Sequence, residues 1–174
     1  CGDGGWSDVS SFTTSEGVVV LFVDDDDNTP DIRPYYTDVF DDLGLTYDVW
    51  DTENSNFEPD LMTLGAYDLV VWASGHEWGG SAGPGPEGEA ALSAWLDTGG
   101  TLLLSSQDYL YDQGLTSFGS NYLGVSDYES DEGQSVVAGV TAPFDGMSST
   151  TLNYPFSDYS DVLELSAAGA VAFD

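Results

Sequence analysis

The sequence has almost no basic side chains. One arginine, no lysine and one histidine stand against 32 aspartates and glutamates, which gives a formal net charge of −31 at pH 7. A negative field of this size repels nucleic acid and anionic membranes, so neither is expected as a partner. It attracts cations, and it destabilises the compact state unless counter-ions screen the repulsion. We therefore expect a halophilic-like setting of high salt or extracellular calcium; the alternative is an acidic surface that only serves solubility.

Cysteine and long hydrophobic runs are scarce as well. The one cysteine is Cys1, so the chain has no internal disulfide and no thiolate cluster for a metal. No apolar run approaches the ~20 residues of a membrane-spanning helix. The chain also lacks an initiator Met, which indicates a processed or excised chain. Its opening CGDGG resembles the start of a mature bacterial lipoprotein, which makes Cys1 a candidate lipid anchor; the alternative is a fragment that happens to begin at cysteine.

Apolar residues are nevertheless plentiful enough for a folded core. Hydrophobic residues make up 41% of the 174 residues, and the aromatic ones are 5 Trp, 10 Tyr and 8 Phe. This composition excludes a disordered acidic tail and suits a single domain. Residues 1–16 are rich in Gly, Ser, Thr and Asp and are expected to be a leader or linker. Residues 17–174 are expected to form the domain.

Apolar, β-branched segments alternate with helical patterns along the first part of the domain. Strands are expected at 17–23, 45–50, 68–74 and 101–106. Helices are expected at 34–43 and 86–96, with a short helix or turn at 59–64. Strands this apolar are typical of a parallel sheet that is buried on both faces. The pattern predicts an α/β fold with a doubly wound, mainly parallel sheet and helices on both faces.

The pattern weakens after residue 107. Residues 109–125 are expected to be helical in pieces. A strand is expected at 134–140, in an antiparallel extension, and a last strand near 170–173. We therefore expect the C-terminal part to be an irregular, loop-rich extension of the domain.

Five stretches along residues 17–173 carry a family resemblance. They read VVVLFVDDDD, YYTDVFDDLGLTYDVWD, YDLVVWASG, LSAWLDTGGTLLLSSQDYLYD and NYLGVSDYESDEGQSVVAGV. Together they resemble a class I glutamine amidotransferase-like domain of the kind found in large secreted or surface-anchored bacterial and archaeal proteins. The resemblance implies a three-layer flavodoxin-like fold and an extracellular or cell-surface location. Further strands usually follow in such domains, so the resemblance also implies a chain truncated at its C-terminus.

The resemblance does not extend to catalysis. Catalytic members carry a nucleophilic cysteine on a sharp turn after a strand, with a histidine and a glutamate downstream. Here the matching turn is LLSSQDY, with Ser105 or Ser106 in place of the cysteine and no flanking glycines. The only histidine, His76, lies upstream in another loop. We therefore expect no glutaminase activity.

Four consecutive aspartates follow the first strand and form the strongest candidate site. In open α/β sheets, ligands bind beyond the carboxyl ends of the strands. Alternation along an extended chain places Asp24 and Asp26 on one side and Asp25 and Asp27 on the other. The candidate ligands for Ca²⁺ or Mg²⁺ are Asp24, Asp25, Asp26, Asp27, Asn28 and Asp31. The alternative is a solvated acidic loop in which Asp24 or Asp25 caps the next turn.

Two known acidic motifs fail at this cluster. DDDDNTPD begins like an EF-hand loop, but Thr29 stands at its sixth position instead of glycine, and Tyr35 at its twelfth instead of glutamate. A phosphate-accepting receiver domain needs a lysine and an aspartate after the third strand, and both are missing. No organic cofactor is expected, because the glycine-rich loop 79–88 lacks the lysine of a phosphate-binding loop.

Three functions from different classes remain open. The first is a non-catalytic structural or interaction domain that binds protein partners or copies of itself in a repeating surface assembly. The second is a diverged serine hydrolase with Ser106 or Ser105 as nucleophile and His76 as base, although no G-x-S-x-G motif is present. The third is a carbohydrate-binding module that uses clustered aromatics such as Trp78 and the tyrosines after residue 108.

Overall fold

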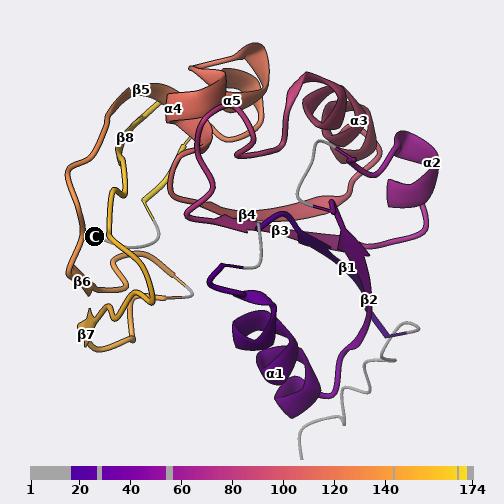
Figure 1. Ribbon diagram of the computed structural model, residues 1–174, viewed down its shortest axis with the longest axis horizontal. Helices are drawn as coiled ribbons and strands as arrows, with labels where there is room; N and C mark the ends of the chain where they lie inside the picture. The colour runs from indigo at the N-terminus through magenta and orange to yellow at the C-terminus, as the bar shows by residue number, and fades with distance from the viewer. Residues whose placement is uncertain (1–16, 27–28, 54–56, 143, 168, 172–174) are drawn as a thin grey trace, which may run out of the picture.

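The computed structural model describes residues 17–26, 29–53, 57–142, 144–167 and 169–171. Cys1, the expected leader 1–16, Asp27 and Asn28 lie outside these residues. A four-stranded parallel sheet forms the centre, in the order β2-β1-β3-β4 (Figure 1). Its strands are β1 (Val19–Asp24), β2 (Thr46–Asp51), β3 (Leu69–Gly75) and β4 (Thr101–Ser106). The predicted α/β fold with a mainly parallel sheet is confirmed.

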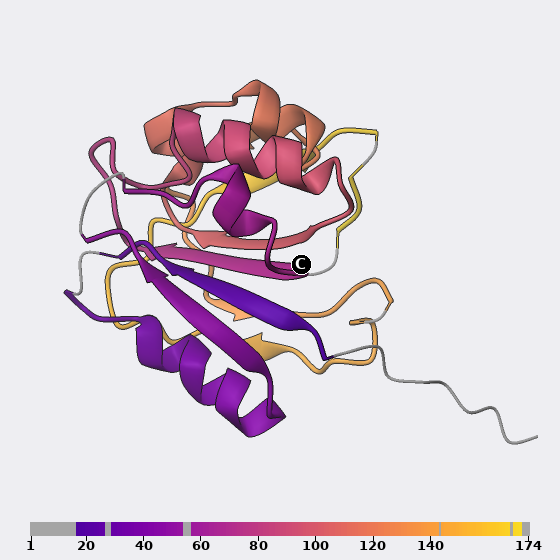
Figure 2. The ribbon, with the colours of Figure 1, turned by 90° about the vertical axis from the view of Figure 1, so that its right-hand side faces the viewer.

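Helices lie on both faces of this sheet. α1 (Arg33–Leu43) covers one face, and α2 (Leu61–Leu64) and α3 (Pro86–Leu96) cover the other (Figure 2). Side chains of β1 alternate between two buried cores, as expected for a strand covered on both faces. The core beneath α1 contains Val20, Phe22, Phe40, Val71 and Ala73. The core beneath α3 contains Leu21, Val23, Val70, Trp72, Leu92 and Trp95.

The helix boundaries follow the local signals in the sequence. α1 has Pro34 in its first turn, where a missing N–H costs nothing. It ends at Gly44, whose φ of 67° is a left-handed conformation that favours glycine. α3 begins after Gly85 and also has a proline, Pro86, in its first turn. Among the described residues, no helix is long and apolar enough to cross a membrane.

The strand order places a switch point between β1 and β3. From β1 the chain passes to β2 at one edge, and from β3 it passes to β4 at the other. Loops therefore diverge at the carboxyl ends of β1 and β3, which is where open α/β sheets bind ligands. Asp25 and Asp26 follow β1, His76 follows β3 and Gln107 follows β4. The four parallel strands thus bring the candidate residues together at the carboxyl ends of the strands, which we call the carboxyl edge.

The C-terminal part differs in detail from the prediction. α4 (Tyr109–Gln113) and α5 (Ser117–Asn121) are the expected helical pieces. β5 (Val125–Glu129) pairs antiparallel with β8 (Val162–Leu165), and β6 (Val136–Val137) pairs with β7 (Thr150–Thr151). These are separate two-stranded sheets, so they do not extend the main sheet. The expected strand at 134–140 shrinks to two residues, and Ala170 and Val171 are not in a strand. The last described strand is β8 instead.

Candidate functional site

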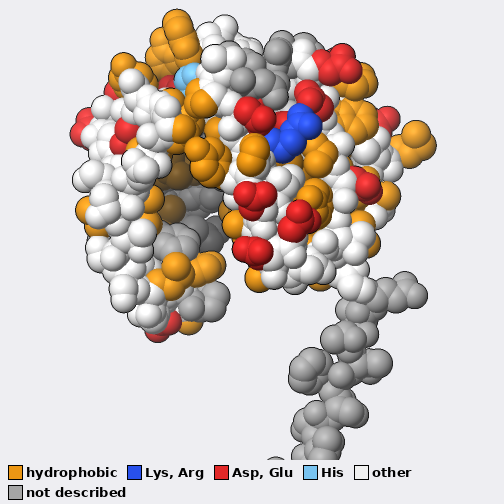
Figure 3. All heavy atoms as spheres, turned by 60° about the horizontal axis from the view of Figure 1, so that its bottom comes forward, with side chains coloured by type: hydrophobic (Ala, Val, Ile, Leu, Met, Phe, Trp, Pro, Cys, Tyr) orange, Lys and Arg blue, Asp and Glu red, His pale blue; other side chains and the backbone are white. Residues whose placement is uncertain are grey.

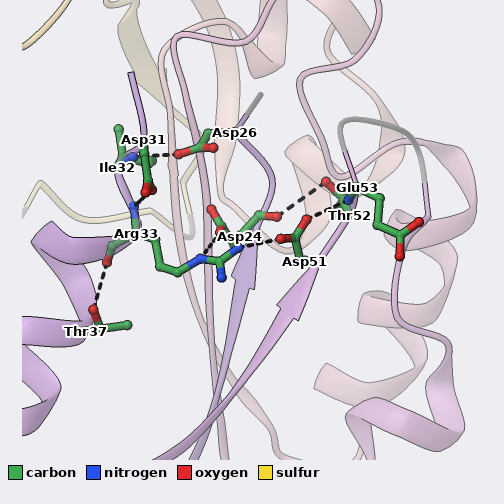
Figure 4. A network of polar contacts seen from close by, with 9 residues as sticks. All are labelled: Asp24, Asp26, Asp31, Ile32, Arg33, Thr37, Asp51, Thr52 and Glu53. Carbon is green, nitrogen blue, oxygen red and sulfur yellow. Dashed lines mark hydrogen bonds and ion pairs between the residues drawn. The ribbon is translucent and has the colours of Figure 1, made fainter. Parts of the chain in front are cut away.

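Asp24 closes β1 on the α1 side and is paired with the chain's one arginine. The Nε of Arg33 donates to Asp24, and its Nη2 donates to Asp51 Oδ2 at 2.5 Å (Figure 4). In Figure 3 the blue arginine lies among red acidic side chains. Asp24 is only 1% exposed, and this burial raises its pKa to about 6 although Arg33 pulls it down. The other carboxylate oxygen, Oδ1, is buried and has no hydrogen-bond partner among the described residues.

Asp26 and Asp31 shape the turn that leads into α1. Asp26 Oδ2 accepts a hydrogen bond from the backbone N–H of Ile32 at 2.6 Å. Asp31 Oδ1 accepts one from the N–H of Arg33 at 3.0 Å. Both carboxylates accept hydrogen bonds from N–H groups at the start of α1 (Figure 4), as aspartate side chains commonly do in turns.

Asp25 points to the opposite side, as the alternation predicts. It is 4% exposed, and its Oδ2 accepts from the indole N–H of Trp72 at 2.9 Å and from the N–H of Gly83 at 3.0 Å. Burial raises the pKa of Asp25 to about 7 despite these bonds and a hydrogen bond with the Thr52 side chain. The side chains of Asp25 and Asp24 therefore lie on the two faces of the sheet and bind different side chains, Trp72 and Arg33.

The structure brings no complete metal cage together from the predicted ligands it describes. Among the described residues, no three acidic, histidine or cysteine side chains are placed to hold one ion. Arg33 supplies a positive charge between Asp24 and Asp51, next to the expected cation site. Asp27 and Asn28 lie outside the described residues. Binding of Ca²⁺ or Mg²⁺ at this turn stays a prediction.

The glycine-rich loop after β3 binds the protein's own carboxylates. Asp112 accepts from the N–H groups of Gly79 and Ala82, at 2.9 and 3.0 Å. Glu58 accepts from the N–H groups of Gly85 and Gly88, at 2.6 and 2.7 Å, at the start of α3. Burial raises the pKa of Glu58, and the two N–H groups lower it. Sequence reasoning missed both acids; a glycine loop without lysine in an acid-rich chain is the signal that could have found them.

Ser105, Ser106 and His76 reach the same edge but are not joined. Ser106 Oγ accepts from Ser74 Oγ at 2.5 Å, and Ser105 Oγ accepts from the hydroxyl of Tyr36 at 2.8 Å. His76 stacks on Phe156 with ring centroids 4.9 Å apart. Its Nδ1 is buried, and within the described part of the chain it has no hydrogen-bond partner. The arrangement lacks the serine–histidine bond of an activated nucleophile.

Two cavities open at this edge. The smaller, of about 330 Å³, lies beside Ser105, Ser106 and Tyr36. The larger, of about 620 Å³, extends from His76 to the loop that precedes β8. Three exposed aromatic side chains line the larger cavity: Trp78 after β3, Tyr111 on α4 and Tyr159 before β8. We call this larger cavity the aromatic cleft, and its other wall residues include His76, Gln107, Asp108 and Asp131.

Two carboxylates, those of Asp108 and Asp131, stand along one wall of the aromatic cleft, and in the described part of the chain no arginine pairs with them. Asp108 is 5% exposed and accepts from the side-chain amide of Gln107 at 3.1 Å. Burial raises its pKa, and the charges of Asp112 and Asp131 add to this, whereas His76 lowers it. Burial, together with the charges of Asp108 and Asp131, also raises the pKa of nearby Asp161 to about 6. The cleft therefore combines aromatic faces with crowded negative charge.

Comparison of the chain with protein-family profiles, with curated proteins and with solved structures finds no match.

Proposed function

We propose that this chain is a non-catalytic interaction domain of an extracellular or cell-surface protein, with the three-layer flavodoxin-like arrangement of an amidotransferase-like domain. The proposal is supported mainly by the contacts of the serine and histidine side chains at the carboxyl edge. Ser106 is bound to Ser74, Ser105 is bound to Tyr36, and His76 is stacked on Phe156. These contacts occupy the side chains that a hydrolase would use as nucleophile and base, and they therefore favour a non-catalytic role.

Charge supports the surface setting. A net charge of −31 requires screening, and extracellular calcium or high salt supplies it. Asp24 Oδ1 is a buried carboxylate oxygen for which the described residues offer no hydrogen-bond partner, and Asp24 is close enough to Asp26 that the two charges interact. A bound Ca²⁺ would satisfy that oxygen, since carboxylates are its preferred ligands. The expected partners are proteins or copies of this chain in a surface assembly.

An activity assay distinguishes the non-catalytic domain from the alternative, a serine hydrolase. We expect the purified chain to show no hydrolysis of activated esters or of glutamine above buffer. Ser106→Ala and His76→Ala should leave that baseline unchanged. Turnover that is lost in both variants, while the variants still fold, would establish the hydrolase and remove the proposal. Tyr35→Ala serves as control, because Tyr35 lines the smaller cavity but bonds neither serine.

Ligand binding in the aromatic cleft is the second function that a specific observation favours. Trp78, Tyr111 and Tyr159 are 68%, 57% and 51% exposed, and they line one cavity. Exposed aromatic faces that converge from three segments are typical of a recognition surface. A carbohydrate-binding module would use such faces for stacking on sugar rings. Titration with neutral oligosaccharides, followed by tryptophan fluorescence, tests this form of the proposal.

A further inference from the structure

The aromatic cleft has a chemical character that selects among ligands. Its aromatic side chains come from three separate segments, and the indole of Trp78 is the most exposed of them. Aromatic faces carry negative potential, and they attract both sugar rings and organic cations. The aromatic residues alone therefore do not decide between a neutral and a charged ligand.

The carboxylates that line the aromatic cleft favour a positively charged ligand. Asp108 and Asp131 line the cleft, and Asp161, which accepts a hydrogen bond from the backbone N–H of Asp131, adds a further carboxylate nearby. The chain's only arginine is engaged with Asp24 and Asp51 on the α1 side, so it does not neutralise this wall. A neutral sugar would leave the repulsion between these carboxylates unchanged, whereas a positive group would relieve it. An anionic ligand would be repelled by both carboxylates of this wall.

We propose that the aromatic cleft binds an alkylammonium group, held over the face of Trp78 and beside the carboxylates of Asp108 and Asp131. The inference rests on the proposed interaction function and names the ligand chemistry of that same edge. Cation–π attraction and ion pairing act together here, because aromatic faces and carboxylates share one cavity of about 620 Å³. That volume is ample for a group of the size of choline.

The experiment is a titration of the full chain with choline, followed by calorimetry and tryptophan fluorescence. Its uncharged carbon analogue, dimethylbutanol, has the same shape without the positive charge. We expect saturable binding of choline, at least ~10-fold weaker binding of dimethylbutanol, and a loss of choline affinity as NaCl is raised. Equal binding of both compounds would overturn the proposal. Binding of a neutral disaccharide with no binding of choline would overturn it in favour of the carbohydrate module.

Two substitutions test the placement. Trp78→Ala should weaken choline binding by ~10-fold or more without unfolding the chain, because the indole is largely exposed. Asp131→Asn should weaken it by several-fold; Asn tolerates the positive φ of 61° at this position. Glu132→Gln is the matched control, since it removes the same charge one residue away. Equal losses of choline affinity in Asp131→Asn and Glu132→Gln would show that only long-range attraction acts. That result would refute binding in the aromatic cleft.

A second titration assigns the source of the ammonium group. Acetyl-lysine amide, with a free side-chain amine, stands for a lysine of a partner protein, whereas choline stands for a small cation. Tighter binding of either one supports the ammonium site and identifies its source. A chain that binds neither compound refutes this inference but leaves the non-catalytic proposal intact, which only the hydrolysis assay decides.

Discussion

Asp25→Asn removes the most strongly perturbed charge of the β1 cluster while keeping its shape. Burial raises the pKa of Asp25 from 3.8 to about 7, although the N–H groups of Trp72 and Gly83 bind its Oδ2. The folded state thus holds the proton more tightly than the unfolded chain does. The protonated carboxyl therefore contributes its full stabilisation below about pH 4. This contribution declines as the pH rises and is lost above about pH 7. The ionised carboxylate costs about 4 kcal/mol at higher pH, since one pKa unit is about 1.4 kcal/mol.

The amide of the variant retains an acceptor oxygen for Trp72 and Gly83 and cannot ionise. The variant should therefore be stabilised relative to the wild type by about 2 kcal/mol more at about pH 8 than at about pH 5.5. Taking the difference between two pH values cancels any change in hydrogen-bond strength that the amide introduces. Urea denaturation at both pH values, in a constant high concentration of NaCl, measures this quantity.

Asp42→Asn is the matched control, because Asp42 is exposed on α1 and loses the same charge. Its effect should stay within about 0.5 kcal/mol at both pH values. A gain for Asp25→Asn that does not depend on pH would refute the raised pKa. A loss of stability at about pH 8 would show instead that a cation binds the ionised carboxylate, and it would favour the metal site.

Three further predictions address the same edge. Arg33→Met should destabilise the fold by about 2 kcal/mol near pH 8, because it leaves the ionised Asp24 buried without its counter-charge. The loss in urea denaturation should shrink as the pH falls toward about 6 and be small below it, because Asp24 is then protonated with or without Arg33. Gly83→Ala should cost about 2 kcal/mol, since a Cβ there would lie 2.5 Å from Asp25 Oδ2, whereas Gly146→Ala, with open space, should cost little. Added Ca²⁺ should raise the melting temperature more than NaCl of equal ionic strength, and a chelator should reverse this; identical curves in the two salts would leave only screening.

The central sheet was predictable because its sequence signals are strong. The run that becomes β1 is apolar on both faces, and only a sheet covered on both sides buries all of Val20–Val23. The parallel order then fixed which loops meet at the carboxyl edge. The C-terminal strands were less predictable, because β8 is exposed along its length and β6 and β7 are two residues each. Short exposed strands carry little hydrophobic periodicity.

The side-chain contacts of the candidate site were harder to predict than its position at the carboxyl ends of the strands. Alternation correctly separated Asp24 and Asp26 from Asp25. It gave no information on Arg33, because a salt bridge from the start of α1 to the end of β1 depends on where the helix sits above the sheet. The aromatic cleft was similarly hidden, since Trp78, Tyr111 and Tyr159 come from three distant segments that only the fold brings together.

The glycine loop explains how a chain with one basic side chain can bury carboxylates at all. Asp25 accepts a hydrogen bond from the backbone N–H of Gly83, and Glu58 accepts from those of Gly85 and Gly88 at the start of α3. Such N–H groups stabilise negative charge much as lysine or arginine would. A Cβ at Gly83 or Gly88 would lie within 2.6 Å of a carboxylate oxygen, so only glycine lets the backbone approach so closely. Asp24 has Arg33 instead, and its Oδ1 has no hydrogen-bond partner among the described residues, so a bound cation would satisfy this oxygen.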